Sequence, residues 1–87
     1  MTHTTSLPIA ILVTIHPAGR NAGWRDAQRV EVNHDPARGG VWATVENRRR
    51  LFCLVTGVEL SAPQAHERRW ELREPARVEL RRLFRLQ

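Results

Sequence analysis

The sequence predicts an α+β fold: a small, mainly antiparallel sheet of three or four strands, with C-terminal helices packed on one face. Two observations lead to this prediction. Apolar residues alternate with polar ones through much of the chain up to residue 60, and this period of two is typical of strands. Beyond residue 60 the apolar period becomes helical. At 87 residues the chain is expected to be one domain, residues 1–87, with residues 1–6 disordered.

Two strands are predicted before the middle of the chain. Residues 7–15 are apolar on both faces, which suits a central strand. Residues 17–26 contain two glycines and a proline and are interpreted as a loop, with Trp24 as a lid on the core. Residues 27–34 alternate weakly and predict a half-exposed strand, and residues 35–40 predict a turn.

The clearest alternation, in residues 41–60, predicts a β-hairpin that leads into a helix. No glycine lies at the polar break after Glu46, so we expect a loop of three to five residues rather than a tight turn. One face of the hairpin is expected to be wholly apolar and buried. It comprises Val41, Ala43, Val45, Leu51, Cys53 and Val55. The other face, which carries Trp42 and Phe52, is either covered by the helices or a binding surface.

Helical spacing of apolar residues begins at Ala62. Thr56 and Ser61 are both candidate helix starts. Pro63 is tolerated only in a first helical turn, which favours Ser61 as the N-cap or a break after a short turn at 57–61. Pro75 removes a hydrogen bond inside the helical stretch, so we expect two helices, near 62–73 and 75–86, or one kinked helix.

Part of the hairpin resembles a known family. The residues concerned are Trp42 and the run Asn47-Arg48-Arg49-Arg50-Leu51-x-Cys53-x-Val55-Thr56-x-x-x-Leu60, with Asp35-Pro36-Ala37-Arg38 as the lead-in. This pattern is similar to that of the small bacterial DUF1488 family over about residues 35–60. The family has no established activity to carry over. The resemblance therefore implies a compact α+β fold and no particular chemistry.

Arginine supplies all 14 basic side chains, against nine acidic ones, and the net charge of +5 favours an acidic partner. Two arginine groups are candidate contacts to nucleic acid or to an acidic protein. The first is the predicted hairpin tip, with Arg48, Arg49 and Arg50; the second is a ridge at helical spacing, with Arg73, Arg77, Arg81 and Arg85. The alternative for both groups is a solvated surface whose arginine stems cover the edge of the core.

Three aromatic residues are candidate interface anchors: Trp42, Phe52 and Trp70. Trp42 and Phe52 near Arg50 would suit a platform on which single-stranded bases stack, although burial under the helices is the competing interpretation. Cys53 is predicted to be a buried structural thiol, because no histidine is placed to activate it. As the single cysteine, it fits a reducing compartment.

No catalytic, cofactor or metal signature is present in the sequence, so we expect a protein that is not an enzyme and has no cofactor. The apolar run 7–15 is too short to cross a bilayer, and a cytoplasmic protein with no membrane partner is expected. The predicted function is that of a small regulator or inhibitor of nucleic acid or a nucleoprotein complex. A phage or mobile-element counter-defence protein, such as an anti-CRISPR, fits this type. The alternative is a protein–protein module or homodimer.

Overall fold

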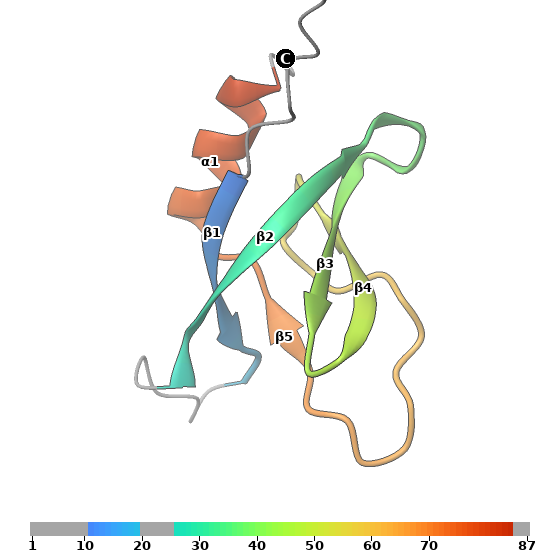
Figure 1. The fold of residues 1–87 in the computed structure, drawn as a ribbon. Helices are drawn as coiled ribbons and strands as arrows, with labels where there is room; N and C mark the ends of the chain where they lie inside the picture. Colours follow the sequence, from blue (N-terminus) through green and yellow to red (C-terminus); the bar gives the residue numbers. More distant parts are fainter. Residues whose placement is uncertain (1–10, 20–25, 85–87) are drawn as a thin grey trace, which may run out of the picture.

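The computed structural model describes residues 11–19 and 26–84, which form an antiparallel sheet of five strands and one C-terminal α-helix (Figure 1). The strands are β1 (Ile11–Pro17), β2 (Gln28–Asp35), β3 (Gly40–Val45), β4 (Arg48–Cys53) and β5 (Trp70–Glu71), and the helix is α1 (Glu74–Leu83). A short 3-10 turn, Pro36–Arg38, joins β2 to β3. The expectations for residues 1–6, for the start of the first strand and for Trp24 lie outside the described residues.

The sheet curls until it is nearly closed as a barrel. Its strand order is β4-β3-β2-β1-β5, so β1 to β4 form a meander and β5 returns to the free side of β1. Residues 58 and 59 then bridge the two outer strands, because Phe52 pairs with Glu59 and Val58 pairs with Glu71. The α+β prediction is confirmed, but the strand number is five rather than three or four.

The core fills the inside of this curled sheet. Its strand residues are mainly β-branched, which suits a pleated and buried surface. Helix α1 contributes Leu80, which is fully buried, and packs Ala76 and Phe84 against the same cluster. The Phe84 ring stacks on His34 of β2, with ring centroids 4.1 Å apart. The buried apolar core members are Val13, Ile15, Val30, Val32, Val41, Ala43, Val45, Phe52, Leu54, Trp70, Leu72 and Leu80.

The hairpin turn differs from the prediction. Val45 pairs with Arg48, so the turn consists of two residues, Glu46 and Asn47, and the expected loop of three to five residues is wrong. Both turn residues have positive φ, 51° and 66°, as the primed turns of tight hairpins require. Left-handed backbone is unfavourable for Glu46, but its carboxylate accepts hydrogen bonds from Arg50 and Trp70, each at 3.2 Å.

The short turn also changes which side chains share a face. Val41 pairs with Phe52, and Ala43 pairs with Arg50, so Phe52 and Arg50 point into the core. Leu51 and Cys53 lie on the opposite face, beside Trp42. The predicted apolar face was therefore wrong by one residue in β4, and a one-residue shift moves every side chain of a strand to the other side.

A single helix replaces the two that were predicted. A helix is present where 75–86 was expected, but α1 ends at Leu83, and residues 85 and 86 lie outside the described residues. Residues 62–69 form no helix or strand, and Trp70 begins β5. Helical spacing in 62–73 depended on Ala62 and Ala65, which are both exposed and have little apolar surface to bury. Burial of Trp70 at 2% exposure stabilises the extended arrangement instead. In the described part of the chain, no helix is long and apolar enough to cross a membrane.

Candidate functional site

The predicted arginine tip of the hairpin is divided between two sides of the sheet. Arg48 is half-buried and Arg50 is 1% exposed, whereas Arg49 between them is exposed. Alternation along β4 explains the division, because neighbouring residues of a strand point to opposite faces. Arg48 and Arg50 therefore belong to the interior, and only Arg49 is available to a partner.

Arg48 and Arg50 lie in a cluster of charged side chains that we call the ion cluster. Its members are Glu46, Arg48, Arg50, Glu59 and Glu67. The Arg50 guanidinium donates to the Arg68 carbonyl at 2.7 Å and to Glu46 and Glu67 at 3.2 Å each, and it lies 3.5 Å from Glu59. Three carboxylates surround two guanidinium groups, so the cluster neutralises both arginines internally.

The ion cluster fastens the irregular segment 59–69 to the hairpin. Arg48 binds Glu67 through two N–H groups, at 2.6 and 2.7 Å, and also donates to the carbonyl of Ala62. Glu67 in turn accepts from the backbone N–H of Gln64. A guanidinium that binds a carboxylate through two parallel bonds holds both groups in one geometry. The cluster therefore stabilises a segment that has few apolar side chains to bury.

Acid should weaken this fastening. The side-chain bond from Arg48, followed by the backbone N–H of Gln64, lowers the pKa of Glu67 from its ordinary 4.5 to about 2. A carboxyl group with a lowered pKa stabilises the fold above its unfolded pKa, and that stability is lost as pH falls through the folded pKa. The difference in unfolding free energy between wild type and Glu67→Gln should therefore narrow between pH 4.5 and about 2. Urea unfolding at a series of pH values measures it; a difference that stays constant would contradict the role given to Glu67.

Trp42 and Arg49 meet on the outer side of the sheet, where they form a surface that we call the outer face, together with Asn33 and Thr44. The Arg49 guanidinium carbon lies 5.5 Å from the centroid of the Trp42 ring, and Arg49 also donates to the side-chain oxygen of Asn33 at 3.3 Å. Diagonal neighbours on adjacent strands are within reach of long side chains, which explains this contact. Trp42 is half-buried and Thr44 is exposed.

Asp35 fixes the orientation of the Trp42 ring. Its carboxylate accepts from the indole N–H at 2.8 Å and from Arg38 at 2.9 Å. The hydrogen bond from Trp42, followed by the contacts with Arg38, lowers the pKa of Asp35. The carboxylate is therefore ionised at neutral pH, and the indole is held in one position at the edge of the outer face.

The other predicted anchors lie in the core. Phe52 is fully buried, and Trp70 is 2% exposed with its indole N–H donated to Glu46. Neither side chain can act as a surface anchor. The proposed stacking pair of Trp42 and Phe52 is not brought together, because the two residues lie on opposite sides of the sheet.

The arginine ridge of the last helix is only partly free. Arg73 precedes α1 and donates to Glu71 at 3.1 Å, and Arg77 donates to the Leu72 carbonyl at 2.7 Å. Arg81 is half-buried and has no carboxylate partner among residues 11–19 and 26–84. Arg85 lies outside the described residues. The stretch therefore contains two arginines that hydrogen-bond within the local fold, and Arg81 is the described member for which the described residues supply no such bond.

Cys53 is half-buried on the outer side of β4 rather than in the core. Its sulfur accepts the backbone N–H of Thr56 at 3.4 Å, and hydrogen bonding from Thr56 lowers the pKa of the thiol. The described residues contain no group of three side chains that could hold a metal ion.

Comparison with known proteins gave no match to a family model, a curated protein or a solved structure. The resemblance to the DUF1488 family consequently stays a prediction from the sequence.

Sequence reasoning missed the ion cluster, because its five members come from three separate stretches of the chain. One signal was present. With a two-residue turn, Arg48 and Arg50 share a face with Val45 and Val41, and such a face must neutralise its charges. Glu59 and Glu67 were the carboxylates available to do so.

Proposed function

We propose that this protein is a non-enzymatic regulator or inhibitor that binds single-stranded nucleic acid, either free or within a nucleoprotein complex. It would act in the cytoplasm. The outer face would make the contact, and a phage or mobile-element counter-defence role is one setting that suits it. The observation that carries the proposal is the pair of Trp42 and Arg49, an indole held by Asp35 beside an exposed guanidinium.

The pairing of charges leaves Arg49 available on the outer face. All nine acidic side chains lie in the described residues, and seven of them pair with an arginine there. The other two are Glu74 of α1 and Glu31, which lies on the same face of β2 as Asn33 and so adds one carboxylate to the outer face. Arg49 has no carboxylate partner in the described part of the chain, so it is free to bind a phosphate. Proteins that bind single strands combine such cationic groups with aromatic rings on which bases stack.

Hydrogen-bonding groups around the ring support the same proposal. Asn33 and Thr44 flank Trp42 and Arg49 on the outer face and can bind base edges or sugar hydroxyls. Arg48 and Arg50 take no part in the proposed contact, because the ion cluster neutralises them. Arg73 and Arg77 have partners of their own, so the proposed surface is smaller than the fourteen arginines suggest.

Binding to a labelled single-stranded oligonucleotide, measured by fluorescence anisotropy, tests this proposal. Trp42→Ala should weaken binding by about 1–3 kcal/mol, the usual contribution of one stacked base. Arg49→Gln should weaken it and make the slope of log affinity against log salt shallower by about 0.7, the contribution of one phosphate contact on a single strand.

Arg69→Gln is the matched control, since it removes the same charge from an exposed arginine that belongs to neither β3 nor β4. It should change binding less than Arg49→Gln does. Absence of binding at about 50 mM salt, where electrostatic contacts are strong, would reject the proposal. Loss of binding in Arg81→Gln but not in Arg49→Gln would assign the contact to the helix instead.

A further inference from the structure

Among the described residues, the edge of β1 that faces away from β2 has no paired strand over most of its length. Residues 11–15 pair with β2 on one side, but only His16 and Pro17 pair with β5 on the other. After Glu71 the chain leaves this edge and enters α1. Within the described residues, no strand pairs with the edge of β1 that β5 vacates.

The backbone groups on this edge can be identified from the alternation of the strand. The N–H of Ala18 donates to the carbonyl of Arg69, on the side of β5. In an antiparallel ladder every second residue directs its N–H and C=O to the same side. Leu12 and Thr14 therefore present their backbone groups to the open edge, whereas Val13 bonds toward β2.

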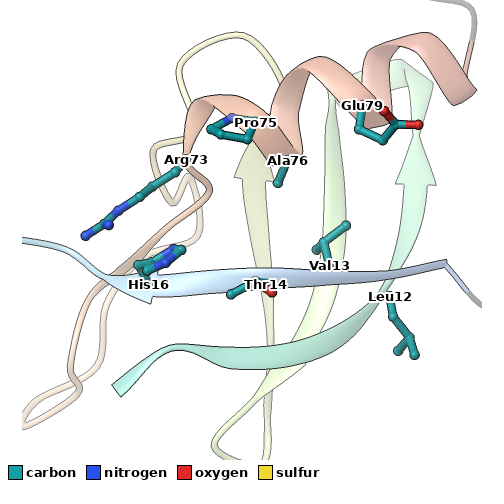
Figure 2. Close-up of a pocket in the computed structure, with 8 residues that line it drawn as sticks. All are labelled: Leu12, Val13, Thr14, His16, Arg73, Pro75, Ala76 and Glu79. Atoms are coloured by element: carbon teal, nitrogen blue, oxygen red, sulfur yellow. The ribbon is translucent and has the colours of Figure 1, made fainter. Parts of the chain in front are cut away.

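A groove of about 450 Å³ lies along this edge, between β1 and the first turns of α1 (Figure 2). Leu12, Val13 and Thr14, three consecutive residues of β1, all line it. Side chains of consecutive strand residues point to opposite faces, so a groove that all three line lies at the edge of the strand. The lining is mainly apolar. Its residues are Leu12, Val13, Thr14, His16, Arg73, Pro75, Ala76 and Glu79.

The groove differs in charge at its two ends. Figure 2 shows Arg73 beside His16 at one end and Glu79 toward the other. Arg73 donates its Nε to Glu71, and its other guanidinium N–H groups have no partner in the described residues. His16 Nδ1 is buried and also without a hydrogen-bond partner there. Glu79 pairs weakly with Arg82 at 3.8 Å.

We propose that this groove binds an extended peptide segment of a protein partner, which adds a strand to β1 and lies beneath α1. The segment has apolar side chains at its centre and an acidic side chain at the end that meets Arg73 and His16. Strand addition supplies affinity through backbone hydrogen bonds and specificity through alternate side chains. The inference does not depend on the nucleic-acid function, since β1 and the outer face of β3 and β4 are separated by β2.

A random decapeptide library, displayed on phage and panned against the full-length protein, supplies the probe. Enriched peptides should alternate apolar residues and carry an acidic residue at one end. Thr14→Pro removes one N–H from the open edge and leaves the ladder to β2 intact, because Thr14 bonds away from β2. It should weaken an enriched peptide about tenfold, as expected for one lost hydrogen bond with its steric cost.

Arg73→Glu changes the groove without altering β1 and should also weaken acidic peptides by about tenfold or more. Arg49→Gln is the control and should have no effect on peptide affinity. Failure to enrich any consensus would overturn the proposal, as would peptides that bind both groove variants as well as wild type. Slow amide exchange at Leu12 and Thr14 that becomes fast when residues 1–9 are removed would also overturn it, because the chain would then fill its own groove.

Discussion

Arg50→Ala should destabilise the protein by about 3–5 kcal/mol, the usual cost of removing one partner from a buried ion pair. The substitution leaves three carboxylates, of Glu46, Glu59 and Glu67, without the guanidinium that they share. It also removes the donor to the Arg68 carbonyl. A small domain has a total stability of only about 5–15 kcal/mol, so the variant should be close to unfolding at room temperature.

Arg49→Ala is the control for this prediction, because it removes the same side chain one residue earlier. Arg49 is exposed and contacts Trp42 and Asn33, so its loss should cost about 1 kcal/mol or less. Urea unfolding of the two variants measures the difference. A greater cost for Arg49→Ala would mean that the hairpin does not have the two-residue turn, because a register shifted by one residue would exchange the positions of the two arginines. Equal costs would contradict the burial of Arg50.

Gly57→Ala should be the second severe substitution. Gly57 has a φ of +79°, and a Cβ at this position would collide with the backbone carbonyl of Leu72. The Leu72 N–H also donates to the carbonyl of Gly57, so the two segments cannot separate without losing that bond. We expect about 1–2 kcal/mol from the left-handed backbone and about 1–3 kcal/mol from the overpacked contact.

Gly39→Ala separates these two contributions. Gly39 has a similar φ of +64°, but nothing lies within 4 Å of its added Cβ. Gly39→Ala should therefore reduce the free energy of unfolding by only about 1–2 kcal/mol, the cost of the left-handed backbone alone. Thermal or urea unfolding of both variants gives the comparison. If Gly57→Ala is no worse than Gly39→Ala, residues 57 and 72 do not approach closely and the barrel is not closed there.

The strands and the last helix could be predicted because their apolar residues repeat at a clear period. Val30 and Val32 of β2 and Val41, Ala43 and Val45 of β3 alternate as buried residues, as the sequence indicates. Leu80 lies on the apolar stripe of the helix and is buried. These positions depend only on local pattern and burial.

The remaining structure depends on contacts between distant residues. Glu46 forms a tight turn without glycine because Arg50 and Trp70 bind its carboxylate. Trp70 is 24 residues away in the chain, so the local sequence pattern cannot predict this turn. Segment 62–69 is held by Glu67 and Arg48, which are 19 residues apart, rather than by its own helical spacing. The candidate site differs from the predicted arginine tip because of the same distant contacts. The two-residue turn that they stabilise places Arg50 inside the sheet and leaves Arg49 beside Trp42 on the outer face.

The most direct measurement of the proposed function is an NMR titration of the labelled protein with a single-stranded oligonucleotide. The indole N–H signal of Trp42 and the backbone signals of Arg49, Asn33 and Thr44 should shift first, and they should return toward their free positions as salt is added. The buried indole of Trp70 should not respond. Shifts confined to α1 and Arg81, or no shifts at low salt, would contradict the assignment of binding to the outer face.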